Sequence, residues 1–325
     1  MTKKAENKPE EKSFYCFDQD IGFWGVPNLK QEVYFGYDDN RPILVEHNSY
    51  GLREAPLGDK IAPSILCCGG SHTWGAGIRQ DKRYSDLLKD KHKSNFINMG
   101  HCSLGLDQIV LAIMKNAQKF NTKIIIIEQY TWALHRVITK YVNGYIRPNF
   151  SLDEQNNLVL NKIPSFYKNK AVRKVIGNYH NFKKELNEFQ SGIDLKKSYD
   201  LKKDPVFLSW KTNYYTTMYE LIDAIVGVLV SFCKEHKIKL LFSLSPLKNQ
   251  LDFKSNSALI DYDLPHKKFR SILIKNGAKF IDNTPAMIEE HKESPVIFPD
   301  GHLNEKGHAL LFKYISQELL RLKWI

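Results

Sequence analysis

Short runs of apolar residues alternate along the chain with longer segments in which apolar residues recur every three or four positions. Five short apolar runs lie at 65–68, 96–99, 123–128, 239–244 and 279–281. Runs of this length, bounded by glycine, proline or polar residues, predict buried parallel strands. Five segments with helical spacing lie at 84–91, 106–120, 210–236, 265–275 and 303–322. Their spacing predicts helices with one buried face.

This alternation predicts a mostly parallel sheet of about five strands with helices on both faces, a three-layer α/β/α sandwich. Residues 133–207 interrupt the alternation, because they are rich in Lys, Asn and Tyr and show weak periodicity. The span is longer than an ordinary connection between elements. We therefore expect an insertion over the top of the sheet, of the kind that forms lids or substrate walls.

The first sixty residues differ from the rest of the chain. Residues 1–12 are charged, contain proline and lack periodicity, which predicts a disordered tail. Residues 13–60 carry aromatic residues, glycines and prolines, with a short strand expected at 42–45 and no helix. We expect this part to be a lead-in segment that packs against a main domain over 61–325.

The composition is that of an ordinary globular protein, with 42% hydrophobic and 26% charged residues. The formal net charge of +11 makes the protein basic, and a basic surface can attract nucleic acid, anionic lipid or acidic glycans. The lysines are spread along the chain, and no nucleic-acid-binding signature is present. A solvated surface is therefore the simpler interpretation, and no nucleic acid partner is expected.

The cysteines and the N-terminus bear on the compartment. Five cysteines, an odd number, occur without a CxxC or Cys/His metal spacing, which fits buried thiols in a reducing compartment. The N-terminus lacks the apolar core of a signal peptide, and no run of about 18 apolar residues predicts a membrane span. We expect a cytoplasmic protein without a cofactor. The sequence does not predict the oligomeric state.

A serine preceded by two glycines follows the first predicted strand. Residues 69–75 read Gly-Gly-Ser-His-Thr-Trp-Gly, so Ser71 lies at the carboxyl end of a strand, where the sites of open α/β sheets collect. Its backbone N–H could then point at an oxyanion, helped by the start of the next helix. The same residues would suit a plain turn with Ser71 as helix N-cap. His72 and Trp74 are expected to line the pocket.

A second polar cluster precedes the last predicted helix, where residues 299–304 read Pro-Asp-Gly-His-Leu-Asn. His302 could take the proton of Ser71 on one ring nitrogen, while Asp300 holds the other nitrogen and stabilises the imidazolium. Alternatively, Asp300 only caps the turn and a backbone carbonyl orients His302. A histidine before a helix is more often a surface or capping residue, so the pairing depends on both segments occurring together.

These segments resemble the sequence blocks of the SGNH/GDSL hydrolase superfamily. Residues 69–75 resemble the first block, with Gly70 where the family has aspartate. Residues 48–53, Asn-Ser-Tyr-Gly-Leu-Arg, match a run that many members carry shortly before it. Residues 98–108 are similar to the second block. Asp-Gly-His at 300–302 is similar to the last block but one residue shorter, as in relatives that handle acetyl groups on polysaccharides.

The resemblance covers roughly residues 40–132 and 237–322, and it is loosest in the middle of the chain. The family's third block, Gly-x-Asn-Asp, is absent after the third predicted strand. Its asparagine donates a hydrogen bond to the oxyanion in the family. Gln129 or Thr131 would have to replace that donor here, since an amide or a hydroxyl can also donate.

The resemblance implies a flavodoxin-like sheet and ester hydrolysis through an acyl-enzyme on Ser71. It implies His302 as base, Asp300 as orienting acid, and an oxyanion hole from the N–H of Ser71 and of Gly105 or Ser103. The expected substrates are small acyl esters, such as O-acetyl groups on a glycan. With a hydroxyl acceptor in place of water, the same site would make the protein an O-acyltransferase.

A catalytically silent module that binds a glycan or a protein partner is the alternative from another class. The missing third block and Gly70 favour it. A metal site is not expected, because His72, His101 and the other histidines lack the spacing of metal ligands. Arg136, shortly after the third strand, would either bind an anionic substrate group or make a surface ion pair.

Overall fold

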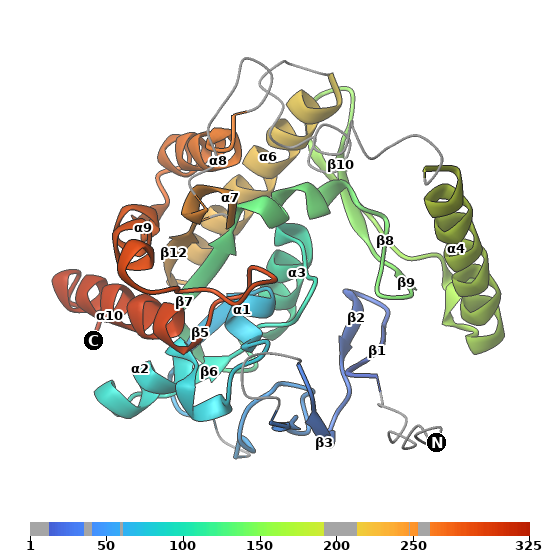
Figure 1. Ribbon diagram of the computed structural model, residues 1–325. Coiled ribbons are helices and arrows are strands. Elements are labelled where there is room, and N and C mark those ends of the chain that lie inside the picture. Colours follow the sequence, from blue (N-terminus) through green and yellow to red (C-terminus); the bar gives the residue numbers. More distant parts are fainter. Residues whose placement is uncertain (1–12, 36–40, 59–60, 192–212, 247, 253–260) are drawn as a thin grey trace, which may run out of the picture.

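The computed structural model describes residues 13–35, 41–58, 61–191, 213–246, 248–252 and 261–325. A five-stranded sheet forms the centre of the molecule, in the order β13-β12-β7-β5-β6 (Figure 1). Its strands are β5 (Ser64–Gly69), β6 (Phe96–Asn98), β7 (Thr122–Tyr130), β12 (Lys239–Ser245) and β13 (Lys279–Asp282). Every neighbouring pair is parallel. In chain order the strands read 2-1-3-4-5, the flavodoxin-like arrangement, so the predicted fold class is confirmed.

The central strand β7 shows why the predicted strands are apolar at nearly every position. Ile125 and Ile127 lie in one hydrophobic core, whereas Ile124 and Ile126 lie in the other. Successive side chains of a strand point to opposite faces of the sheet. A strand covered on both faces therefore needs an unbroken apolar run.

Helices cover both faces and give the molecule three layers (Figure 1). One face packs against α2 (Tyr84–His92), α9 (Thr284–Glu293) and α10 (Glu305–Arg321). The other face packs against α3 (Leu106–Asn116), α6 (Asn213–Glu235) and α8 (Leu264–Lys275). Two short helices, α1 (Ser71–Trp74) and α7 (Lys248–Leu251), follow β5 and β12. Helix α9 was not predicted, because only two of its residues, Met287 and Ile288, are large and apolar.

Before the main sheet, the chain forms two antiparallel strand pairs. Strand β1 (Tyr15–Asp18) pairs with β2 (Gly22–Gly25), and β3 (Lys30–Val33) pairs with β4 (Ile43–Glu46). The strand expected at 42–45 is β4. The other three were not predicted, because each has four residues without regular alternation. The predicted tail over 1–12 lies outside the described residues.

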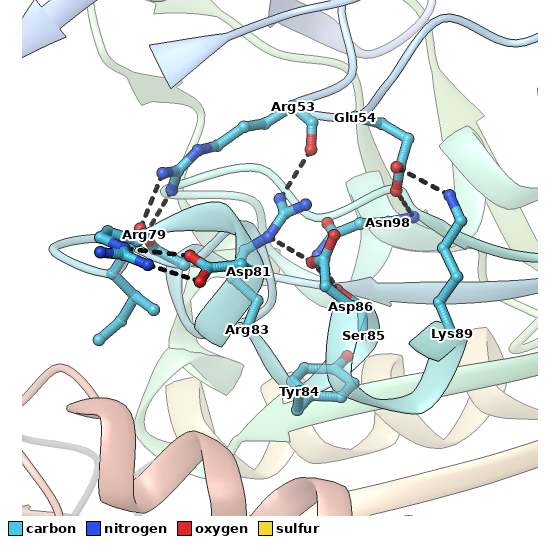
Figure 2. Close-up of polar contacts among 12 residues, drawn as sticks. Arg53, Glu54, Arg79, Asp81, Arg83, Tyr84, Ser85, Asp86, Lys89 and Asn98 are labelled. Carbon is cyan, nitrogen blue, oxygen red and sulfur yellow. Dashed lines mark hydrogen bonds and ion pairs between the residues drawn. The ribbon is translucent and has the colours of Figure 1, made fainter. Parts of the chain in front are cut away.

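Two buried arginines join this N-terminal part to the chain after α1 (Figure 2). Arg53 donates to the carbonyl oxygens of Gly75 and Ile78 at 2.6 and 2.7 Å, and Arg83 donates to that of Arg53 at 2.7 Å. Burial, with the charge of Arg83, lowers the pKa of Arg53 to about 9. Arg53 ends the Asn-Ser-x-Gly-x-Arg run, so that run fixes the C-terminal end of the helix that begins at Ser71.

The segment that follows β7 contains several small elements. They are η2 (Thr131–Ile138), β8 (Tyr141–Val142), β9 (Tyr145–Ile146), β10 (Asn149–Leu152), β11 (Leu158–Asn161), η3 (Ser165–Lys168) and α4 (Lys170–Ser191). The β10–β11 hairpin packs against α3 and α6, at the side of the sandwich, because its apolar residues join that core. The segment was expected over the sheet; among its described residues, those that line the cavity at the carboxyl edge belong to η2. Residues 192–207 lie outside the described part.

Two further observations concern membrane-spanning helices and the cysteines. None of the helices they form is both long enough and apolar enough to cross a membrane. All five cysteines are outside disulfides. Cys67, Cys68 and Cys233 are buried, and burial raises the pKa of the Cys233 thiol to about 12, which makes it a poor nucleophile.

Candidate active site

Ser71 lies at the carboxyl edge of the sheet, as the first residue of α1. The preceding strand ends at Gly69, where a Cβ atom would lie 2.1 Å from Oγ1 of Thr73 and 2.8 Å from the carbonyl oxygen of Glu128. Only glycine allows α1 to fold back this closely on β5 and β7. The N–H of a first helical residue has no acceptor within its helix. Ser71 therefore presents a hydroxyl and a backbone donor at this edge.

The loop before α10 brings His302 to this serine. Nε2 of His302 lies 2.9 Å from Oγ of Ser71, and Nδ1 lies 2.7 Å from Oδ2 of Asp300. Oδ1 of Asp300 accepts the backbone N–H of His302 at 3.1 Å. Gly301 between them has a φ of +96°, a conformation that favours glycine. The Asp-Gly-His spacing thus folds the carboxylate back onto the ring that follows it.

Helix packing explains how residues 231 positions apart in sequence meet. Helix α10 packs beside α2, and Nδ1 of His308 accepts the backbone N–H of Tyr84, the first residue of α2, at 3.2 Å. Oδ1 of Asn304 caps α10 by accepting the N–H of Gly307 at 3.0 Å. The start of α10 is therefore held beside α2, and this places the loop that carries His302 at the carboxyl end of β5.

The surroundings of His302 favour its neutral form. Burial lowers the pKa of this imidazole, and the neighbouring His72 lowers it further, while the hydrogen bond and charge of Asp300 oppose the shift. The net pKa lies below the usual value of 6.5. A ring that is neutral near pH 7 can accept a proton from a hydroxyl.

A cavity of about 240 Å³ opens beside the three residues. Its wall is mixed, with the aromatic side chains of Tyr130 and Trp132 and the charged side chains of Arg136 and Lys248. The volume is below the range of about 300–1,000 Å³ that is usual for pockets of drug-sized ligands. The cavity therefore suits a small substrate group.

The structure places two of the six expected lining or donor residues, His72 and Gln129, in the wall of this cavity. One amide hydrogen of Gln129 is donated to the carbonyl oxygen of Tyr130 at 2.9 Å. Trp74, in contrast, is buried away from the cavity. Its ring lies 4.7 Å from the guanidinium of Arg53, so it anchors the N-terminal segment to α1.

Three of the residues expected to complete the oxyanion hole, Gly105, Ser103 and Thr131, do not line the cavity. The N–H of Gly105 donates to Oε1 of Gln108 at 3.3 Å, within the cap of α3. Ser103 is half-buried with a φ of +65°, and Thr131 is fully buried outside the cavity wall. The backbone N–H of Ser71 and the second amide hydrogen of Gln129 are the remaining donors of the expected set.

Glu128 is a residue of this site that the sequence analysis did not single out. It is 1% exposed at the carboxyl end of β7 and lines the cavity. Its Oε1 accepts the hydroxyl of Ser245 at 2.6 Å and lies 3.3 Å from Nδ1 of His72. Its Oε2 has no partner among the described residues. A carboxylate directly after four buried isoleucines was the signal in the sequence.

Among the described residues, no group of three or more His, Cys, Asp or Glu side chains is arranged to hold a metal ion. Of the other histidines considered for such a site, His72 lies beside His302, with ring centroids 5.8 Å apart, whereas His101 and His308 make other contacts. His101 packs on the ring of Trp24 at 4.2 Å, and His308 stacks on Tyr84.

No protein-family model matches the chain, and no curated protein matches it in sequence. Several solved structures are similar to it. The psychrotrophic esterase EstA from Pseudoalteromonas sp. is 12% identical, with 81% of this chain and 100% of that chain covered and a TM-score of 0.43. A member of the lipolytic protein G-D-S-L family from Veillonella parvula DSM 2008 is 14% identical (79% and 98% covered, TM-score 0.43). The acetyl xylan esterase AlAXEase is 12% identical (79% and 99% covered, TM-score 0.44).

Proposed function

We propose that this chain is a divergent SGNH/GDSL hydrolase that cleaves small acyl esters, with Ser71 as nucleophile, His302 as base and Asp300 as orienting acid. The observation that carries the proposal is a pair of hydrogen bonds beside a cavity: Nδ1–H of His302 donates to Oδ2 of Asp300 (2.7 Å), and the hydroxyl of Ser71 donates to Nε2 of His302 (2.9 Å). A nucleophile within reach of a base that a third group orients is the arrangement that activates a serine hydroxyl.

In the first half of the reaction, Oγ of Ser71 attacks the acyl carbon and its proton passes to Nε2 of His302. The lowered pKa of His302 keeps this nitrogen free to accept the proton. Asp300 holds the opposite ring nitrogen and stabilises the imidazolium. His302 then gives the proton to the leaving alkoxide, and the acyl group stays on Ser71.

In the second half, water attacks the acyl carbon and gives a proton to His302, which returns it to Oγ of Ser71 as the acid leaves. The N–H of Ser71 donates to the oxyanion in both halves. A hydroxyl acceptor in place of water would transfer the acyl group instead. The polar side chains of Glu128 and Gln129 in the cavity wall support a hydroxyl-bearing partner such as a glycan.

Hydrolysis of p-nitrophenyl esters from acetate to octanoate tests this proposal. We expect the highest kcat/KM on acetate, and losses of kcat on the order of 10³-fold or more in Ser71→Ala and in His302→Ala. Ser231→Ala, at an exposed position of α6, is the matched control and should behave as the wild type. Unchanged turnover in Ser71→Ala would overturn the proposal. A wild type that hydrolyses no ester but binds a glycan would support the silent binding module.

A further inference from the structure

A guanidinium faces the cavity without a carboxylate beside it. Arg136, on η2, is half-buried and lines the cavity that contains Ser71. Its Nη1 donates to the carbonyl oxygen of Leu104 at 3.2 Å, and its charge lies 5.7 Å from the centre of the Trp132 ring. In the described part of the chain it forms no ion pair with an acidic side chain. Most of its N–H donors are therefore available to a ligand.

Two acidic side chains line the cavity. Asp300 holds His302, and Glu128 holds Ser245 and His72 with Oε1, while its Oε2 has no hydrogen-bond partner among the described residues. Burial has the largest effect on Arg136 and lowers its pKa, Cys102 raises the pKa, and another cation, Arg147, lowers it. A desolvated cation without a counter-ion is costly, and an anionic ligand would remove that cost.

Gly70 leaves open the place where the chain itself could supply a carboxylate. A Cβ atom on Gly70 would lie 3.8 Å from Nη1 of Arg136, with nothing closer around it. The φ of Gly70 is −85°, so the backbone does not require glycine for a left-handed conformation. A carboxylate at this position would therefore have room beside the guanidinium, and the chain places none there.

We infer that the substrate supplies this carboxylate, so that the site prefers esters bearing an anionic carboxylate, held by Arg136, over neutral esters of the same shape. The inference rests on the proposed ester hydrolysis and names its substrate class. The planar fork of an arginine matches two carboxylate oxygens. Lys248 also lies in the cavity wall, but it forms an ion pair with Asp252 at 3.3 Å. The net charge of +11 adds positive potential that attracts an anion.

The first experiment compares charged and neutral esters. One pair, 4-acetoxybenzoate and its methyl ester, carries the charge on the alcohol side, and a second pair, mono-p-nitrophenyl adipate and its methyl ester, carries it on the acyl side. In Arg136→Gln, the charged-to-neutral ratio of kcat/KM should fall roughly 10- to 100-fold for at least one pair, the range for hydrogen bonds to a charged group. The fall should come mainly from KM. Arg79→Gln, at an exposed arginine, should leave both ratios unchanged.

Several outcomes separate this inference from the proposed hydrolysis. An equal loss on charged and neutral esters would overturn it, because Arg136 would then serve the oxyanion or the fold. An unchanged ratio would also overturn it. If the wild type cleaves no ester, calorimetric titration with 4-hydroxybenzoate and with adipate monomethyl ester decides. If Arg136→Gln abolishes the binding, the anion subsite stands although the proposed hydrolysis fails. If the variant binds as the wild type does, both the subsite and the proposed hydrolysis are overturned.

A second pair of variants tests the open position at Gly70 and leaves Arg136 unchanged. Gly70→Asp places a carboxylate beside the guanidinium, whereas Gly70→Asn adds a side chain of the same shape without charge. The charged-to-neutral ratio should fall about tenfold or more in Gly70→Asp relative to Gly70→Asn, since the internal carboxylate competes with that of the substrate. Equal ratios in the two variants would contradict the inference.

Discussion

His302 has neighbours that shift its pKa in opposite directions, and this gives the site a testable pH dependence. Burial and His72 lower the pKa, whereas Asp300 raises it, with a net value below 6.5. The base must be neutral to act, so kcat/KM should fall only when the pH drops below about 6.5. A pH–rate profile on p-nitrophenyl acetate measures this limb.

Asp300→Asn sharpens this test. Removing the carboxylate removes the influence that raises the pKa of His302, so the acidic limb should move to lower pH. Turnover should also fall, by about 10²- to 10⁴-fold, because the ring loses the partner that fixes its tautomer. A limb that moves to higher pH, or a wild-type limb well above pH 6.5, would show that His302 is not the titrating base.

At the residue scale, the sequence led to the three side chains that the structure brings together, because each stands at the edge of a strand or helix with a turn glycine nearby. It did not lead to the donors around them. The N–H of Gly105 donates to the side chain of Gln108, and the ring of Trp74 packs against the guanidinium of Arg53. The contact between Trp74 and Arg53 depends on packing between segments distant in the chain, which no local pattern contains.

At the scale of elements, the position of α1 depends on a glycine in the loop after β6. A Cβ atom on Gly100 would lie 2.5 Å from the backbone nitrogen of Trp74 and 2.7 Å from the carbonyl carbon of Thr73. Backbone atoms cannot rotate away, so Gly100→Ala must displace α1 and Ser71 with it. We expect a loss of about 1–3 kcal/mol in the free energy of unfolding, measured with urea.

Gly58→Ala is the matched control, because a Cβ atom there meets nothing within 4 Å. Its stability should equal or slightly exceed that of the wild type. If Gly100→Ala were as stable as Gly58→Ala and kept full esterase activity, the close approach between α1 and the β6 loop would have no role in placing Ser71.

Some elements of this fold could be predicted from the sequence and others could not. All five strands of the central sheet were predicted, because burial on both faces demands unbroken apolar runs such as the four isoleucines of β7. The small hairpins and α9 were not. Strands β8 and β9 have two residues each, and β3 alternates poorly, so their pairing depends on the surfaces they meet.

At the scale of the whole molecule, one buried ion pair joins the segment after β7 to the main sandwich. Arg147, between β9 and β10, pairs with Asp107 of α3, and both side chains are fully buried. Its Nη1 also donates to the carbonyl oxygen of Arg136 at 2.6 Å. Arg147→Met leaves the buried carboxylate uncompensated and should cost about 3–5 kcal/mol in the free energy of unfolding.

A double variant provides the control for that prediction. Asp107→Leu combined with Arg147→Met removes both charges, so it should be more stable than Arg147→Met alone by thermal or urea denaturation. If Arg147→Met unfolded like the wild type, the pair would not hold the inserted segment in place. The sequence could not predict the pair, because its two residues are 40 positions apart and belong to different layers.

Mapping the adduct formed with a fluorophosphonate shows whether His302 activates Ser71 as a nucleophile. Mass spectrometry of the wild type should find one phosphonyl group, on the peptide that contains Ser71. Ser71→Ala should carry none, and the labelling rate of His302→Ala should fall by roughly 10²-fold or more. A wild type that stays unlabelled, or an adduct that persists in Ser71→Ala at the wild-type rate, would contradict the account.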